Sequence, residues 1–157
     1  MERKVRFSCL LVILFSLPAL LICCSGGAKD YLATPEDTIK TYNRQASNMH
    51  AMIDTLSYSK AIECFSKPAQ GWFAANANSL VKNPDELDGY SGSRREAYVF
   101  IRYIVPNGPK TSFGEPAIEK ISESGKEAKY KVNGFEVTLI KDGNNWRFKS
   151  MFGMEGG

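Results

Sequence analysis

The dipeptide Asn133-Gly134 constrains the fold more than any other feature, because it stands between two short runs of alternating apolar and polar residues. A two-residue type I′ turn needs a positive φ at both positions, and Asn-Gly satisfies that need well. The dipeptide therefore predicts an antiparallel hairpin of 127–132 with 135–141. The pairs are Val132 with Phe135, Tyr130 with Val137 and Ala128 with Leu139 on one face, and Lys131 with Glu136 on the other.

A second turn, at Asp142–Asn145, extends the same sheet and supports the same register. It places a strand over 146–152 beside 135–141, with Leu139 opposite Phe148 and Phe135 opposite Phe152. A slip of one residue would move every apolar side chain to the other face, so two turns that agree make the register secure. A further strand over 117–122 completes a four-stranded sheet. The expected apolar face consists of Tyr130, Val132, Phe135, Val137, Leu139, Trp146 and Phe148.

The N-terminal half is predicted to be helical. Thr34 can cap a helix, Pro35 suits its first turn, and Glu36 and Asp37 favour the positive end of the helix dipole. Helical spacing continues over one apolar stripe: Ile39, Tyr42, Ala46, Met49, Ile53 and Leu56. The opposite face carries Lys40, Arg44, Gln45 and Ser47. Further helices are expected over 59–65 and from Pro68, the latter with Trp72, Phe73 and Leu80 as its apolar members.

The segment between the two halves is less regular. Residues 83–96 are rich in turn-forming and charged residues and predict an exposed loop. Residues 98–105 are compatible with a strand by composition and with a helix by spacing, and we favour the helix. Helices followed by an antiparallel meander predict an α+β domain, in which the helices cover one face of a curved four-stranded sheet.

This order of elements resembles the NTF2-like (cystatin-like) superfamily of cone-shaped α+β domains. The resemblance rests on Thr34-Pro35-Glu36, Ala61, the strand 127–132 and the stretch 137–148, which ends in Trp146-Arg147-Phe148. It implies the cone-shaped fold over most of the chain. It does not imply one function, because the superfamily includes enzymes, binding modules and adaptors.

The N-terminus has the layout of a secretory signal. Arg3, Lys4 and Arg6 precede the uncharged stretch 7–22, and small or polar residues follow at 25–28. An uncleaved membrane anchor is the alternative. It is disfavoured because a spanning helix needs roughly 20 apolar residues, whereas this stretch is shorter and contains Pro18.

The run Leu21-Ile22-Cys23-Cys24-Ser25 resembles a bacterial lipobox. The resemblance implies a signal peptide over 1–23, a lipidated Cys24 with a tether over 24–33, and a domain over 34–157. Cys23 occupies a position where small residues such as Gly, Ala or Ser are usual, which leaves Cys23 as an alternative acceptor. An ordinary signal peptide with apolar cysteines is the other reading. With Ser25 after the cysteine, the resemblance implies a lipid anchor in the bacterial envelope, in the outer membrane.

Charge and cysteine content narrow the partners. Removing residues 1–23 leaves 134 residues with 17 basic and 16 acidic side chains. This near-neutral charge does not predict binding to nucleic acid, which requires an excess of basic residues. Cys64 then remains as the only cysteine besides Cys24. No intramolecular disulfide or cysteine-based metal site is expected, and a buried apolar role is favoured for Cys64.

The residues that bear chemistry are few. His50 is the only histidine, and Asp54 follows one helical turn later, so the two are the weak catalytic candidates. The sequence contains no nucleophile-elbow, P-loop or dinucleotide motif and implies no cofactor and no metal. The aromatics Trp72, Phe73, Tyr130, Trp146 and Phe148 can line a pocket or simply fill the core.

Taken together, these features predict a lipid-anchored envelope lipoprotein. We expect it to act as a non-catalytic module that binds an envelope protein or a small apolar ligand. The alternative is a small-molecule isomerase or dehydratase that uses the interior of the cone and the His50–Asp54 pair.

Overall fold

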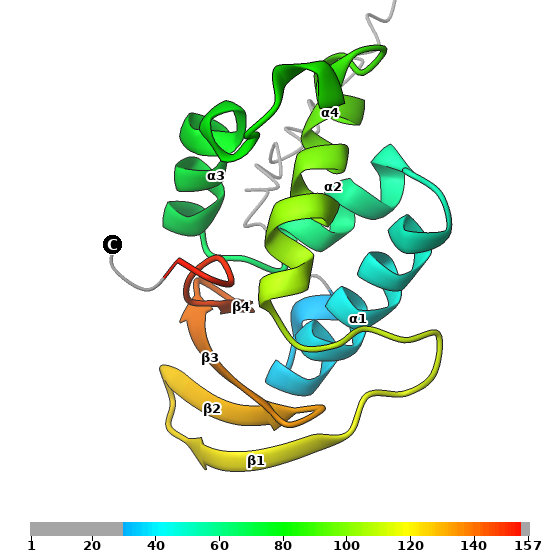
Figure 1. The fold of residues 1–157 in the computed structure, drawn as a ribbon. Helices are drawn as coiled ribbons and strands as arrows, with labels where there is room; N and C mark the ends of the chain where they lie inside the picture. Colours follow the sequence, from blue (N-terminus) through cyan, green and yellow to red (C-terminus); the bar gives the residue numbers. More distant parts are fainter. Residues whose placement is uncertain (1–29, 155–157) are drawn as a thin grey trace, which may run out of the picture.

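A computed structural model describes residues 30–154 (Figure 1), and the predictions for the signal peptide and for Cys24 lie outside this range. The helical elements come first: η1 (Asp30–Leu32), α1 (Pro35–Ala51), α2 (Thr55–Glu63), α3 (Lys67–Leu80), η2 (Pro84–Leu87), α4 (Gly92–Val99), the π-helical turn η3 (Phe100–Ile104) and η4 (Val105–Asn107). The strands β1 (Ile118–Glu123), β2 (Glu127–Val132), β3 (Phe135–Asp142) and β4 (Asn145–Phe148) follow. They form one antiparallel sheet in the order β1-β2-β3-β4.

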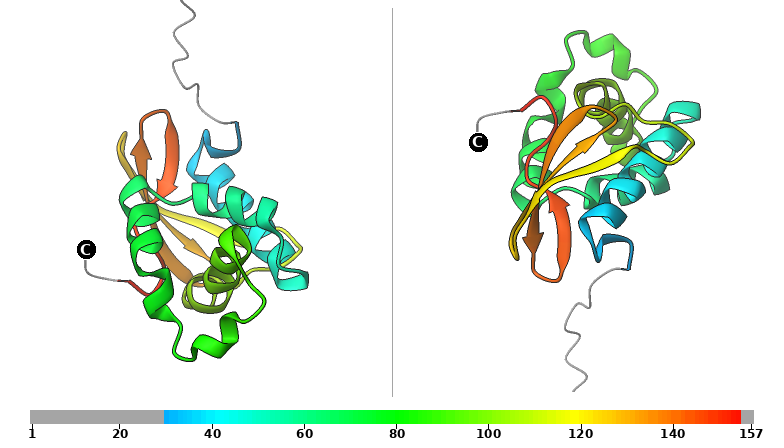
Figure 2. Two further views of the ribbon diagram at one scale, coloured as in Figure 1. Left: turned by 90° about the horizontal axis from the view of Figure 1, so that it is seen from above. Right: turned by 90° about the horizontal axis from the view of Figure 1, so that it is seen from below.

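The predicted α+β architecture is therefore confirmed. Helices lie over one face of the twisted sheet, and the other face is uncovered in the right view of Figure 2. The burial pattern agrees, since Tyr130 and Leu139 on the covered face are buried while Lys129, Lys131 and Glu136 on the opposite face are exposed. The packed part begins before the expected boundary at residue 34, because η1 is helical and its Leu32 is fully buried.

The hairpin register is confirmed pair by pair, from Val132 opposite Phe135 to Ala128 opposite Leu139. Asn133 and Gly134 have φ values of 49° and 86°, as the type I′ turn requires. Phe135 departs from the prediction. It belongs to the apolar face by register but stays 38% exposed, at the edge of the covered area.

The predicted strand over 146–152 is too long. Leu139 pairs with Phe148 as expected, but β4 ends there and Phe152 does not pair with Phe135 in the ladder. The outer edge of β4 is joined to the α2–α3 junction, where Phe148 N–H donates to the Cys64 carbonyl (2.7 Å) and the Phe148 carbonyl accepts from Ser66 N–H (2.9 Å), while Lys149 N–H still donates to the Thr138 carbonyl of β3 (2.9 Å). The chain turns there, and the rings of Phe135 and Phe152 meet at 6.0 Å instead.

Helix α1 begins as predicted but ends early. The Thr34 hydroxyl accepts from Asp37 N–H at 3.1 Å, and Pro35 occupies the first turn. Ile39, Tyr42, Ala46 and Met49 are buried. The stripe does not continue through Ile53 and Leu56, since the helix stops at Ala51 and a new helix starts at Thr55. Leu56 is consequently 64% exposed, whereas Gln45 and Ser47, assigned to the polar face, are buried.

The segment 83–105 is more helical than the sequence indicates. The predicted loop over 83–96 contains η2 and most of α4, while the helix favoured for 98–105 is confirmed as the end of α4 and the turns η3 and η4. Tyr98 precedes the wide π-helical turn and Tyr103 lies within it, and both hydroxyls donate to the Glu86 carboxylate (3.3 and 2.9 Å). These bonds fix η2 against the helix, a long-range effect that local residue patterns do not reveal.

Aromatic rings fill the space between the helices and the sheet. Phe65 lies 5.1–5.8 Å, between ring centroids, from Tyr42, Phe100, Phe148 and Phe152. Phe65 and Phe100 are completely buried, and Tyr42 and Phe148 are 1% exposed. The covered face of the sheet is thus a packed core.

We expect Tyr42→Phe to stabilise the protein. Tyr42 is 1% exposed, and its hydroxyl has no hydrogen-bond partner among the described residues. An unsatisfied buried polar group costs about 1–3 kcal/mol, so its removal should raise the free energy of unfolding by about 1 kcal/mol in a denaturant titration. Tyr58→Phe is the matched control, because the Tyr58 hydroxyl donates to Glu96 at 3.2 Å. A stability loss in Tyr42→Phe as large as in the control would contradict the prediction.

Candidate functional site

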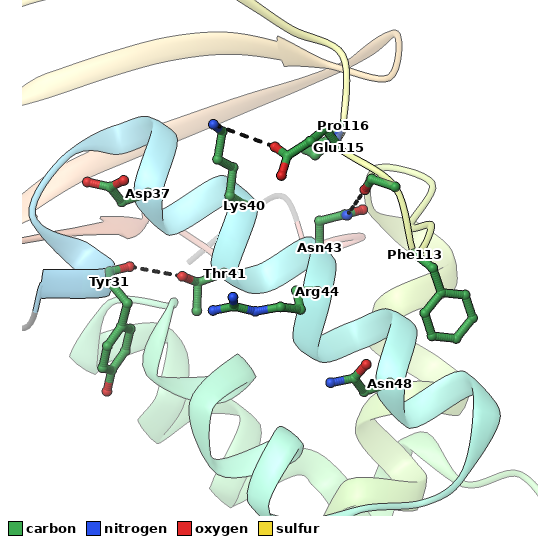
Figure 3. Close-up of a pocket in the computed structure, with 11 residues that line it drawn as sticks. Tyr31, Asp37, Lys40, Thr41, Asn43, Arg44, Asn48, Phe113, Glu115 and Pro116 are labelled. Carbon is green, nitrogen blue, oxygen red and sulfur yellow. Dashed lines mark hydrogen bonds and ion pairs between the residues drawn. The ribbon is translucent and has the colours of Figure 1, made fainter.

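A groove of about 410 Å³ runs along the outer face of α1. One wall is the segment 113–116 that precedes β1, and Tyr31 lies on the other side of the helix (Figure 3). The floor is the exposed stripe of α1. The lining residues are Tyr31, Asp37, Lys40, Thr41, Asn43, Arg44, Asn48, Phe113, Gly114, Glu115 and Pro116.

Two asparagines hold the wall of the groove in place. Asn43 accepts from Ser112 N–H (3.1 Å) and donates to the carbonyls of Ser112 (2.8 Å) and Gly114 (3.0 Å). Asn133, the turn residue, accepts from Ala117 N–H (2.8 Å) and donates to the Lys110 carbonyl (2.6 Å). The segment 110–117 is therefore anchored both to α1 and to the sheet, and its shape is determined before any ligand binds.

The charged side chains of the groove are not equivalent. Lys40 forms an ion pair with Glu115 at 3.5 Å, and Asp37 accepts from the Thr34 hydroxyl at 2.6 Å. The side chain of Arg44 has no hydrogen-bond or ion-pair partner within residues 30–154, and in Figure 3 it extends along α1 toward Thr41. Its guanidinium is therefore the charged group best placed to meet a ligand.

The two ends of the groove differ in polarity. Phe113 is 78% exposed, which is unusual for a large aromatic side chain held on an anchored segment, and it lies at the end nearer to Asn48. The other end carries Asp37 and the phenol of Tyr31, which donates to Glu63. The groove thus combines one unpaired cation, an exposed ring and a carboxylate at the far end.

The structure separates the two catalytic candidates. His50 is exposed in the last turn of α1, whereas Asp54 lies beyond the end of that helix, so they do not share one helix face. Asp54 instead caps α2, accepting from the N–H groups of Leu56 (3.1 Å) and Ser57 (3.0 Å). Hydrogen bonds from the Ser57 side chain and from these two N–H groups lower the pKa of Asp54. Neither residue lines the groove.

The predicted pocket-lining aromatics are mostly core residues. Phe73, Tyr130, Trp146 and Phe148 are 1–6% exposed, and Trp72 is half-buried against the same core. Phe148 also borders a small cavity of about 160 Å³ between β3 and the C-terminal segment. These side chains therefore fill the core, as the second interpretation of the sequence proposes, and do not line a large pocket.

One further side-chain cluster and one buried thiol have structural explanations. The Tyr130 hydroxyl donates to Glu36 (2.6 Å) and lies 3.3 Å from Glu123, so it links α1 to the sheet, and burial together with these carboxylates raises its pKa. A hydrogen bond from Lys120 lowers the pKa of Glu123. Cys64 is fully buried, and burial raises the pKa of its thiol, so it is held as an unreactive thiol.

A second groove, of about 450 Å³, lies between α2 and α4 and is wider and more open. Its single charged group, Glu96, accepts a hydrogen bond from the hydroxyl of Tyr58.

No set of three or more His, Cys, Asp or Glu residues within 30–154 is placed to hold a metal ion. In the same range, no helix is both long and apolar enough to cross a bilayer.

Comparison of the chain with protein-family models, curated proteins and solved structures found no significant match. The class established by the structure is therefore an α+β domain with helices on one face of an antiparallel sheet. What the site does has to be inferred from its own geometry.

Sequence reasoning missed the groove. It placed Arg44 on the polar face of α1, which is correct, but gave no reason to distinguish it from Lys40. It treated Asn133 only as a turn residue, although the same side chain also anchors the segment 110–117. Only the contacts between distant parts of the chain reveal that Glu115 neutralises Lys40, whereas Arg44 has no ion-pair partner within residues 30–154.

We expect Asn43→Ala to loosen the groove wall and lower the free energy of unfolding. Asn43 is 4% exposed and makes three hydrogen bonds to the wall, so the loss should be about 1–3 kcal/mol. Hydrogen exchange at the Ser112 amide should become faster. Asn48→Ala is the control: Asn48 is exposed, and a change within about 0.5 kcal/mol is expected. Equal effects of the two substitutions would show that Asn43 does not anchor the wall.

Proposed function

We propose that this protein is a non-catalytic binding module with an NTF2-like domain, held at the bacterial cell envelope by lipid on Cys24. The observation that carries the binding role is the contrast between interior and surface. Aromatic side chains fill the space under the helices, while the groove on α1 presents an unpaired Arg44 and an exposed Phe113. A filled interior with a shaped surface groove suits recognition of a partner or ligand.

The envelope location and the NTF2-like assignment rest on different supports. The lipobox-like run at 21–25 supports a lipid anchor in the outer membrane. The succession of three helices, a further helical segment and a four-stranded meander supports the NTF2-like cone. We assign no catalytic role to His50 and Asp54, because they lie outside the groove and Asp54 is engaged in capping α2.

Site-specific photo-crosslinking in cells tests the binding role. p-Benzoylphenylalanine replaces Phe113 at the groove or, as the control, Lys129 on the open face of the sheet; both side chains are exposed. Illumination should attach one defined partner or ligand to the protein with the probe at 113, detected by a discrete mass increase, and none with the probe at 129. The same products from both positions, or none from 113, would contradict a binding role for the groove.

A further inference from the structure

We propose that the groove on α1 binds a ligand that carries a single carboxylate next to an apolar or aromatic side chain, as at the C-terminal end of a peptide. This inference rests on the proposed binding function and specifies its ligand. It starts from Arg44, whose guanidinium offers several N–H donors and matches a carboxylate in a bidentate arrangement. The side-chain amide of Asn48, one turn further along α1, adds donors on the same exposed stripe.

The other charges of the groove select the sign and the size of the ligand's charge. Lys40 is paired with Glu115, and Asp37 lies near the N-terminus of α1, where the Thr34 hydroxyl and the helix dipole stabilise it. The charged side chains that line the groove sum to zero, and within residues 30–154 Arg44 is the cation among them that has no ion-pair partner, so a group with one negative charge complements it. A phosphate dianion is less suited, because Asp37 and Glu115 both line the same groove and would repel it.

Phe113 supplies the apolar half of the recognition. Its ring is 78% exposed and lies at the end of the groove where Asn48 is found. An apolar side chain of the ligand that packs against this ring removes apolar surface from water, which favours binding. The wall that carries the ring is preset by the hydrogen bonds of Asn43, so little ordering is needed when the ligand binds.

The volume limits the length of the ligand. Small-molecule sites typically measure about 300–1,000 Å³, and the groove of about 410 Å³ lies near the lower end of that range. It accommodates a terminal residue with its neighbour, and a long peptide would extend past the ends. A free small acid and the end of a chain share this chemistry, so the experiment includes both.

The test uses the full-length, isotope-labelled protein in detergent micelles and follows backbone amide signals by NMR. The probes are N-acetylphenylalanine, its uncharged carboxamide, inorganic phosphate, and the peptide Ala-Ala-Phe with a free or an amidated C-terminus. We expect the acid to shift signals around Arg44 and Phe113 and to bind at least 10-fold more tightly than the carboxamide. Tighter binding of the free peptide than of the acetylated acid would identify a chain end as the source, and the reverse would identify a small acid.

Three variants assign the contacts. Arg44→Gln should remove the preference for the acid over the carboxamide, and Phe113→Ser should weaken both probes. Lys129→Gln, on the open face of the sheet, should change neither. Equal affinities for acid and carboxamide in the wild type, no shifts at the groove, or phosphate binding as tight as the acid would overturn the proposal.

The outcomes also separate the two proposals. Acid binding in micelles without a crosslink at position 113 in cells would leave the ligand class standing and overturn the binding role in the envelope. A crosslink in cells that Arg44→Gln does not weaken, together with no acid binding, would overturn the ligand class alone.

Discussion

Replacing Phe65 with alanine is expected to lower the free energy of unfolding by about 3–5 kcal/mol. The side chain is completely buried, and its ring contacts those of Tyr42, Phe100, Phe148 and Phe152. Truncation removes the buried apolar area and leaves a cavity where helices and sheet meet. Because domains of this size are stable by only about 5–15 kcal/mol, the loss should be evident in denaturant and thermal unfolding.

Phe113→Ala is the matched control for this prediction, since it removes the same side chain from a position that is 78% exposed. A surface substitution of this kind changes stability by about 0.5 kcal/mol or less. Phe65→Leu tests the cavity explanation, because it keeps part of the volume and should cost less than Phe65→Ala. If all three variants unfolded at the same denaturant concentration, the aromatic cluster would not be the stabilising core described here.

Replacing Cys24 with alanine is expected to transfer the protein from the membrane fraction to the soluble fraction. Each buried acyl CH₂ contributes about 0.8 kcal/mol, so a single chain binds weakly while two or more bind almost permanently. If Cys24 is the lipid acceptor, its replacement removes this attachment. Fractionation of cells and metabolic labelling with radioactive palmitate measure the result.

Cys23→Ala is the control for the lipid acceptor, because the two cysteines are adjacent in the sequence. It should keep both the label and the membrane location. Retention of label by Cys24→Ala together with its loss from Cys23→Ala would identify Cys23 as the acceptor. A labelled, membrane-bound Cys24→Ala protein with an unaffected control would contradict lipidation at Cys24.

The early start of the domain has a consequence for the anchored protein. Five residues separate Cys24 from Asp30, where η1 begins. At no more than about 3.3–3.6 Å per residue, this piece of chain keeps Asp30 within roughly 20 Å of Cys24. Tyr31, at one end of the groove, is the next residue, so an anchored domain would present the groove close to the membrane.

The sheet shows how far local signals extend. The turns at Asn133-Gly134 and 142–145 predict the partners of every residue in the β2–β3 hairpin, because a two-residue turn and an alternating apolar pattern permit one register. The strand β4 ends earlier than predicted, and the outer edge of its last residue, Phe148, bonds to Cys64 and Ser66 from the α2–α3 junction. No pattern within the strand itself encodes that contact with the helices.

The helical half shows the same division. The cap at Thr34 and the buried stripe of α1 follow from local residue types, but the break at Asp54 restarts the helix and exposes Leu56. The apolar residues whose spacing predicts one long helix are thus divided between α1 and α2. The cap bonds of Asp54 favour a new helix start, and the buried side chains of α2 then pack against the core.

By itself, the sequence determined the α+β class, the hairpin register, the N-terminal cap of α1 and the small number of residues able to do chemistry. These features depend on turn geometry, side-chain periodicity and capping, which act within a few residues of the chain. Only the tertiary structure decided that the aromatics form a core and that a groove lies on α1. It also decided that Arg44 is left without a partner among residues 30–154 while Lys40 is neutralised by Glu115. Those outcomes depend on contacts such as that of Asn43 with Ser112, 69 residues apart, and such contacts exist only once the chain has folded.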